Sequence, residues 1–446
     1  MTDLKQYRIK AASAAELVNG IEAGVASGAL VPGQRLPSVR RLAAEVGLSP
    51  VTVAAGLAEL RRRGVVLSEP RRGTRIGQGP PIGSSRAPLP VPPGARDLSR
   101  GNPDPALLPD LAGALARCEL PARLYGEPQA LPELLELARE QLRADGVPGQ
   151  HLCIVSGAMD AIERVLEAHV RPGDRVAVEN PGYAALYDLL RAKGLALEPV
   201  ALDERGMLAA DLRRALSRGA VAVVLTPRGQ NPTGAALDSA RARELSAVLG
   251  EFPRTLLIED DHLGPVAGSE LHTLLSARSH PERWAATRSV AKALGPDLRL
   301  AVLAGDAHTI ARVQGRQQCG PGWVSHILQS LVLALWSDPA VHELVARASA
   351  TYSERRERLL SCLASAGVQA HGASGLNVWI PAQEEAGTVG ALMQRGWVVA
   401  PGAAYRLPGA PPGIRVTTAT LTGEEAARLA GDLADVLAPA LVSRSG

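Results

Sequence analysis

Two short helical patterns lie close together between residues 30 and 77. The first follows Ser38 and ends at Gly47, and its apolar positions recur at helical spacing: Val39, Leu42, Ala43 and Val46. The second follows Ser49 and ends at Gly64, with one apolar face made by Val53, Leu57 and Leu60. Because three or four residues join them, the pattern predicts a helix-turn-helix, whose second helix can enter the major groove of DNA.

A β-prone hairpin follows these helices. Its sequence is VVLSEPRRGTRI, residues 65 to 76, with a basic turn around Arg72. Residues 1 to 80 hold 12 Lys+Arg against 6 Asp+Glu, whereas the remainder holds 36 against 39. This basic head on a mildly acidic body predicts an anionic partner, double-stranded DNA.

Beyond residue 77 the pattern changes twice. The segment GQGPPIGSSRAPLPVPPGAR is rich in Pro, Gly and Ser and has no apolar periodicity, which is typical of a tether. Helical stretches then alternate with short apolar, β-branched runs, among them LCIVSG, VAVVLTPRGQNPTG, RTLLIEDDH and RWAATRSVAK. This alternation predicts an α/β fold with a mostly parallel sheet and ligands at the carboxyl ends of the strands.

We therefore expect four segments. These are a winged helix-turn-helix head (1–77), a linker (78–97), a large α/β domain with the main site (98–335), and a smaller C-terminal α+β domain (336–446). Neither end resembles a signal peptide and no apolar run approaches the ~20 residues that span a bilayer, so we expect a cytoplasmic protein. The four cysteines are far apart, which predicts free thiols and no metal site.

Lysine is rare in this chain, with only four among 48 basic residues. One of them, Lys292, lies in TRSVAKALGPDLRL, directly after a predicted strand. Lysine can lose its proton and attack a carbonyl to form a Schiff base, whereas arginine stays protonated. Lys292 is therefore a candidate for covalent chemistry.

The head resembles the winged helix-turn-helix of the GntR family of bacterial regulators, through GQRLPSVRRLAAEVGLSPVTV and RRGTRI. The resemblance implies that seven residues face DNA: Arg40, Ser49, Val51, Thr52, Arg72, Gly73 and Thr74. Pro50 and Ala54 stand where relatives often carry arginine, so the second helix is expected to make fewer phosphate contacts.

The body resembles the fold-type-I pyridoxal-phosphate enzymes, the aspartate-aminotransferase superfamily, from about Leu98 onward. The resemblance implies a phosphate site at a helix start, with further ligands three residues before and seven after Lys292. Its residues would be Ser156, Gly157, Ala158, Ser289 and Arg299.

For the rest of the cofactor, the resemblance implies that Lys292 holds it as a Schiff base and Asp260 pairs with its pyridine nitrogen. Tyr183 would stack on the ring and Asn231 would donate to the 3′-oxygen. A second donor to that oxygen is tyrosine in relatives and His262 here. Because imidazole titrates near neutrality, we expect His262 to affect the charge state of the Schiff base.

Other site residues are implied outside the cofactor pocket. Arg415 resembles the arginine that grips a substrate or effector carboxylate, and Tyr125 the tyrosine that reaches the phosphate of the partner subunit. Ala185 replaces the carboxylate-binding arginine of GABA-sensing relatives, which disfavours GABA, and Ala130 replaces an expected glycine.

Together the halves resemble the MocR/GabR family of bacterial transcription regulators. The family implies a head-to-tail, domain-swapped homodimer that binds DNA, with pyridoxal phosphate, or its adduct with an amine, as effector. The segments GPGWVSHILQ and GLNVWIP resemble a subgroup that controls vitamin B6 salvage, although Trp323 and Trp379 themselves read as core aromatics.

Three functions stay open. The first is a regulator with little or no turnover, the second a bifunctional protein or true aminotransferase acting on an amino acid, and the third a cofactor-free scaffold.

Overall fold

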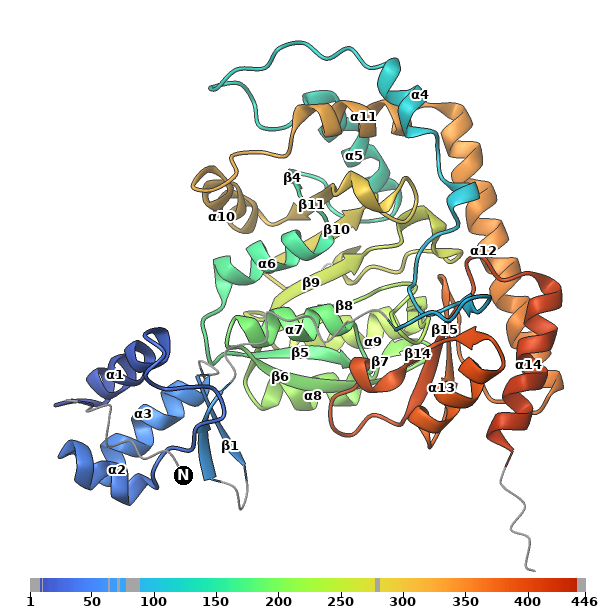
Figure 1. Ribbon diagram of the computed structural model, residues 1–446. Helices are drawn as coiled ribbons and strands as arrows, with labels where there is room; N and C mark the ends of the chain where they lie inside the picture. Colours follow the sequence, from blue (N-terminus) through green and yellow to red (C-terminus); the bar gives the residue numbers. More distant parts are fainter. Residues whose placement is uncertain are drawn as a thin grey trace, which may run out of the picture. The chain divides into compact units, whose positions relative to one another are not determined.

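The head is a winged helix-turn-helix (Figure 1). The computed structural model describes residues 9, 11–62, 65–69, 73–77, 89–276 and 281–438 of the chain. Three helices are followed by two antiparallel strands: α1 (Ala14–Ala26), α2 (Val39–Val46), α3 (Pro50–Arg62), β1 (Val66–Glu69) and β2 (Gly73–Ile76). The predicted pair of helices and the hairpin are confirmed, whereas α1 was not predicted.

Local sequence explains how α2 and α3 begin and end. The Ser38 hydroxyl caps α2 by accepting from the amide of Arg41, and Gly47 ends it in the left-handed conformation at φ 75°. Ser49 accepts from the amide of Thr52 at the start of α3. The apolar faces are buried together, with Val53, Leu57 and Leu60 at most 1% exposed. The predicted stop at Gly64 lies outside the described residues.

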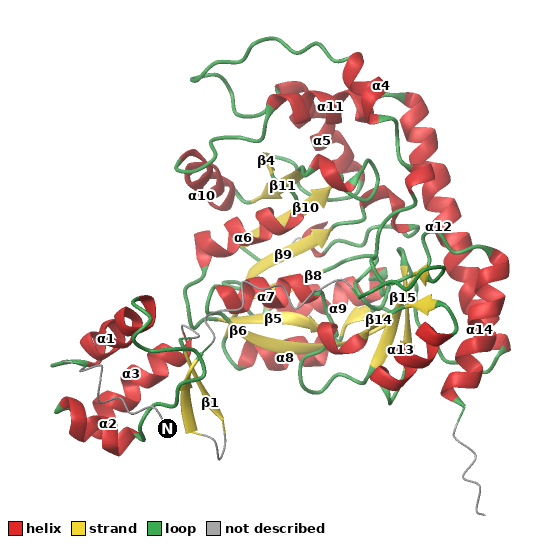
Figure 2. Ribbon diagram, viewed as in Figure 1, coloured by secondary structure: helices red, strands yellow, loops and turns green. Residues whose placement is uncertain are grey.

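The body is built on an eight-stranded sheet of order β4-β11-β10-β9-β8-β5-β6-β7 (Figures 1 and 2). The strands are β4 (His151–Val155), β5 (Arg175–Asn180), β6 (Ala196–Asp203), β7 (Gly206–Met207), β8 (Ala220–Leu225), β9 (Leu256–Asp261), β10 (Arg283–Ser289) and β11 (Ala301–Gly305). β8, β9 and β10 run parallel, while β11 is antiparallel to β10 and β4. The predicted α/β fold is confirmed, and its large sheet is mixed, with β8, β9 and β10 as its parallel part.

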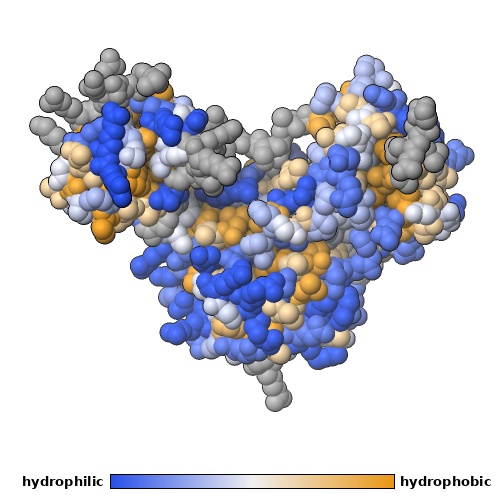
Figure 3. Space-filling model, turned by 90° about the horizontal axis from the view of Figure 1, so that it is seen from below, coloured by the Kyte–Doolittle hydropathy of each residue, from blue (hydrophilic) through white to orange (hydrophobic). Residues whose placement is uncertain are grey.

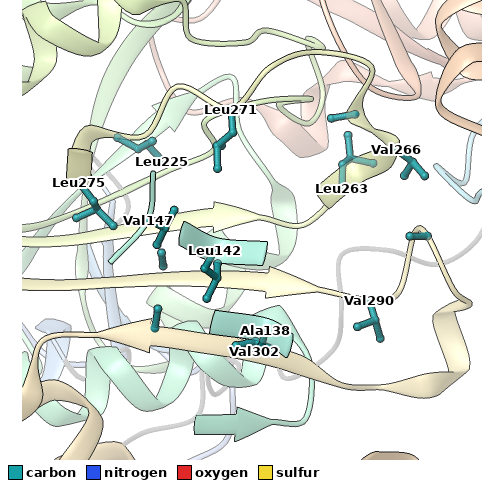
Figure 4. Close-up of a cluster of buried hydrophobic side chains, with 14 of the residues drawn as sticks. Ala138, Leu142, Val147, Leu225, Leu263, Val266, Leu271, Leu275, Val290 and Val302 are labelled. Atoms are coloured by element: carbon teal, nitrogen blue, oxygen red, sulfur yellow. The ribbon is translucent and has the colours of Figure 1, made fainter. Parts of the chain in front are cut away.

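Helices flank the sheet (Figure 2). Five of them contribute to one large apolar core: α4 (Leu111–Ala116), α5 (Pro132–Ala144), α8 (Ala209–Ser217), α9 (Ser239–Gly250) and α11 (His326–Ser337). The others are α6 (Ala158–His169), α7 (Ala184–Ala192) and α10 (Ala307–Gln318). Figure 4 shows part of this core beside the strand ends, including Leu142 of α5, Leu263 after β9 and Val290 after β10. The segments that follow β9 and β10 are thus held by buried leucine and valine side chains.

The C-terminal part has its own sheet, β12-β15-β14, and its own core. Its elements are β12 (Asn377–Pro381), α13 (Glu385–Gln394), β13 (Trp397–Val398), β14 (Ala400–Pro401), β15 (Gly413–Thr417) and α14 (Gly423–Leu437). The long helix α12 (Pro339–Ser365) contributes Tyr352 to the large core and Leu359 to this one.

The residues before Leu98 also belong to this smaller part. β3 (Arg96–Asp97) pairs with β13, and the Arg96 side chain binds Glu425 of α14 at 2.9 Å. Leu98 is buried in the C-terminal core. β3 therefore lies within the last residues of the segment expected to be a linker.

Candidate cofactor site and DNA-binding head

The amine of Lys292 lies in a largely buried position directly after β10. Its Nζ donates to the carbonyl oxygen of Gly101 at 2.7 Å. Burial, and secondarily the charge of Arg415, lowers the pKa of Lys292 to about 8. A lowered pKa increases the fraction of neutral, nucleophilic amine near neutral pH, as Schiff-base formation requires.

Asp260 lies at the end of β9, beside β10, where Thr287 is its register partner. Its side chain is buried, and Oδ1 has no hydrogen-bond partner. Burial raises the pKa of Asp260 to about 7, with smaller contributions from Asp261 and Glu179. A buried carboxylate oxygen without a donor is costly, and a protonated pyridine nitrogen would supply the missing donor.

Three of the residues predicted to bind phosphate lie where β4 ends and α6 begins. Gly157 is the N-cap of α6 at φ 99°, and a Cβ built there would lie 3.1 Å from the guanidinium of Arg299. Arg299 has φ 44°, the one non-glycine residue of the described chain with a positive φ. The close approach of a guanidinium to backbone at a helix start suits an anion such as phosphate.

Ser289 and Ala158, which are also predicted to bind phosphate, lie at the ends of elements: Ser289 is the last residue of β10 and Ala158 the first of α6. The Ser289 hydroxyl accepts from the amide of Ala291, and Ser289 is buried at the end of β10. Ala158 is the first residue of α6, and the Ser156 amide donates to Asp160 at 2.9 Å. The Ser156 side chain is exposed.

Arg415, predicted to bind a carboxylate, contacts Asn231, which is predicted to bind the cofactor. Its Nη1 donates to Asn231 Oδ1 at 2.9 Å, its Nη2 binds the Ser99 carbonyl oxygen, and its guanidinium lies 4.9 Å from the ring centre of Tyr405. Burial lowers the pKa of Arg415, although Tyr405 and Tyr183 oppose the shift. A buried guanidinium held by neutral acceptors can exchange one of them for a carboxylate.

The structure changes the expectation for His262. Its Nδ1 lies 4.0 Å from Asp260 Oδ2, so His262 does lie in the predicted cofactor site. Burial lowers the pKa of His262 to about 4, and the nearby charge of Lys292 acts in the same direction. The expectation that this side chain titrates near neutrality is therefore wrong, because the imidazole is neutral at pH 7 and can only donate as a neutral ring.

Within one chain, the Tyr125 side chain does not pack among the residues of the predicted cofactor site. Its side chain is 93% exposed, and its ring makes an edge contact with Trp323 at 5.6 Å. Trp323 is only partly buried, so its interpretation as a core aromatic is wrong, whereas Trp379 is 3% exposed and is a core residue.

Three polar groups of the site were missed from the sequence. Gly101 supplies the acceptor for Lys292, and Gln230 links Glu179 to the Pro181 carbonyl oxygen. Burial raises the pKa of Glu179 to about 7. The position of Glu179 at the end of β5, four residues before Tyr183, was the available signal.

The residues of the head that are expected to face DNA are placed as follows. Arg40 is exposed on α2, and Val51 is 79% exposed on the first turn of α3. The hydroxyls of Ser49 and Thr52 bond each other at 2.8 Å. Gly73, at φ 80°, and Thr74 begin β2, while Arg72 lies outside the described residues.

Metal-binding groups and membrane-spanning helices also bear on the class of protein. In the described ranges no set of three or more His, Cys, Asp or Glu side chains is grouped to bind a metal ion. There, too, no single helix is long and apolar enough to cross a membrane; only α2 and α3 taken together, bent by 109°, meet that criterion. Blue hydrophilic and orange hydrophobic residues are interspersed over the face seen in Figure 3.

Comparison with known proteins defines the class. Residues 96–433 match the aminotransferase class I and II family, and residues 14–76 match the gntR family of bacterial regulatory proteins. Over 77% of this chain the fold is similar to that of α-aminoadipate aminotransferase LysN from Thermus thermophilus, with TM-score 0.68, 23% identity and coverage of 92% of that chain. The protein is thus an aminotransferase-like body joined to a GntR-type head.

Its relatives narrow this class. The vitamin B6 salvage pathway transcriptional repressor PtsJ of Salmonella typhimurium is 38% identical, over 95% of this chain and 98% of the relative. The pyridoxine biosynthesis transcriptional regulator PdxR of Corynebacterium glutamicum is 31% identical over 55% of each chain. The chain belongs to the MocR-like family of transcription regulators, as its motifs predicted.

Proposed function

We propose that this chain is a DNA-binding transcription regulator that holds pyridoxal phosphate on Lys292 and responds to it, or to its amine adduct, as effector. The main observation is the unpartnered, buried Oδ1 of Asp260 in the same site as a lysine of lowered pKa. An empty scaffold would leave that oxygen without a donor. The relatives named for vitamin B6 salvage and pyridoxine biosynthesis support control of vitamin B6 genes.

Each residue group would have a separate task. Gly157, Arg299 and Ser289 would bind the phosphate, Asp260 would keep the ring nitrogen protonated, and Lys292 would make the covalent link. Bound in this way, pyridoxal phosphate supplies an electron sink. Neutral His262 and Asn231 would donate to the 3′-oxygen, with Tyr183 against the ring.

The regulator is proposed to act as a head-to-tail homodimer in the cytoplasm. The 93% exposure of Tyr125 supports this assembly, because a tyrosine on the outside of one chain is available to reach a second. A ligand can regulate DNA binding only if it favours one arrangement of this assembly over another.

An aminotransferase is the second candidate. Lys292, Asp260 and Arg415 all occupy one site, which is the minimum set for binding an amino acid next to the cofactor. Incubation of the loaded protein with single amino acids separates the candidates. A stoichiometric loss of the visible band with release of a keto acid would favour transamination.

The direct test is the visible absorbance spectrum with and without added pyridoxal phosphate, with DNA binding measured in both states. A Lys292-dependent band that changes operator affinity would identify the cofactor as the signal. A band with no effect on DNA would contradict its role as effector, and no band at all would contradict cofactor binding.

A further inference from the structure

Four charged residues form a cluster beside the site, and none of them was a candidate from the sequence. We call it the Asp261 cluster: Asp261, Arg228, Arg288 and Asp145. Arg228 binds both oxygens of Asp261 with Nε and Nη2, each at 2.9 Å. Arg288 donates from Nε to Asp261 at 3.0 Å and binds Asp145 at 2.6 Å through Nη2.

The cluster is buried and balanced in charge. The side chains of Asp261, Arg228 and Arg288 are each 7% exposed, whereas Asp145 is 35% exposed at its outer edge. The two guanidinium groups lower the pKa of Asp261 against the opposing effect of its burial, so its carboxylate stays ionised. The result is two cations and two anions held in a fixed, mostly dry network.

Each inner member adjoins a segment that carries a predicted cofactor ligand. Asp261 directly follows Asp260 on β9. Arg288 directly precedes Ser289 on β10, where Arg288 and Asp261 are register partners. Arg228 lies three residues before Asn231, in the loop after β8.

Stability alone is a weak reason for such a network. Removing four charges from water costs about as much as their attraction returns, and well-packed apolar residues often stabilise as well or better. A planar guanidinium bound through two nitrogens does, however, fix direction as well as distance. In this cluster the two guanidinium groups fix the relative directions of the ends of β8, β9 and β10.

We propose that Asp261, Arg228 and Arg288 are positioning residues for the cofactor. Their cluster holds the Asp260, Asn231 and Ser289–Lys292 segments at the mutual distances that pyridoxal phosphate needs. This inference rests on the proposed cofactor binding at Lys292. It assigns the cluster no contact with the cofactor itself.

The test compares two arginine-to-lysine substitutions in the full-length protein. Arg288→Lys keeps the charge but loses the simultaneous bonds to Asp261 and Asp145. Arg241→Lys is the matched control, because Arg241 is equally buried and binds both oxygens of Asp203 and the carbonyl oxygen of Met207, none of them in a cofactor segment. Affinity for pyridoxal phosphate, visible circular dichroism per bound cofactor, and Tm are measured for each.

Both substitutions are expected to lower Tm. Arg288→Lys should weaken cofactor binding by roughly tenfold or more, the usual scale for residues that orient ligand-binding groups. It should also change the dichroism per bound cofactor, which reports the orientation of the ring and does not depend on occupancy. Arg241→Lys should leave both cofactor readouts within about twofold of wild type.

Equal cofactor readouts for the two variants would overturn the positioning role. If Arg288→Lys does not fold, Arg228→Lys, which keeps the charge but loses the paired bonds to both oxygens of Asp261, takes its place, and an unchanged dichroism and affinity would again overturn it. Absence of any visible band in the wild-type protein is a different result, because it would refute cofactor binding itself.

Discussion

Asp260 is a buried carboxyl group whose raised pKa makes stability depend on pH. The unfolded chain releases this proton near pH 4, whereas the folded, cofactor-free protein keeps it until about pH 7. The contribution of Asp260 is therefore fully present below pH 4 and is lost as pH rises through 7.

Asp260→Asn removes this pH dependence without changing side-chain size. The Tm difference between Asp260→Asn and wild type, both cofactor-free, should grow in favour of the variant from pH 5 to pH 8. Glu354→Gln, which removes an exposed carboxyl from α12, is the control for a change in net charge. A difference that is constant over this range would contradict the raised pKa.

His262 gives a second test at the level of one residue. A neutral imidazole donating to the 3′-oxygen stabilises negative charge there, so its loss should raise the pH midpoint of the visible band. For His262→Phe we expect a rise of about one unit, the scale of one hydrogen bond to a charged group. His371→Phe, at a partly exposed histidine paired with Glu204, should leave the midpoint unchanged. No rise in His262→Phe would exclude this donor.

Sequence patterns identified residues with unusual chemistry, but not the neighbouring groups that bind these residues and change their pKa. Lys292 and Asp260 were visible because rare or charged residues followed predicted strands. Gly101 and Arg228 were not, since their partners lie 191 and 33 residues away along the chain and no local pattern records such contacts. The neutral state of His262 likewise follows from burial, which only the folded chain reveals.

The helices of the head were predictable because caps and apolar spacing agree with each other. α2 and α3 begin after serine caps, and Gly47 ends α2 at a positive φ that other residues avoid. The strand β3 was not predictable, since two residues in a Pro/Gly-rich segment carry no periodicity. Its partner β13 lies some 300 residues further on.

At the scale of one element, substitution of Arg40 tests whether α2 contacts a DNA phosphate. Because Arg40 is exposed on α2, a phosphate contact would release about one counterion. Arg40→Ala should weaken operator binding and reduce the slope of log affinity against log salt by about one. Arg243→Ala, which removes an exposed arginine from α9 of the body, should change neither. An unchanged slope for Arg40→Ala would exclude a phosphate contact.

For the molecule as a whole, the two halves are expected to bind their ligands with separate residues. Lys292→Ala should abolish the covalent cofactor and its band, yet leave the affinity of the cofactor-free protein for DNA within about threefold, less than one lost hydrogen bond. Lys193→Ala, which removes another of the four lysines, should keep the band. Parallel loss of DNA binding and Tm in Lys292→Ala would contradict this separation.

Because β3 pairs with β13, the position of the junction matters when a body of this kind is fused to a different DNA-binding head. Arg96 and Leu98 belong structurally to the C-terminal part, through Glu425 and its apolar core. A recombination junction downstream of Leu98 would give the body a foreign first strand, whereas one upstream of Arg96 would keep β3 with its own partner strand. Functional chimaeras, whether selected in evolution or assembled in the laboratory, should therefore have their crossover upstream of Arg96.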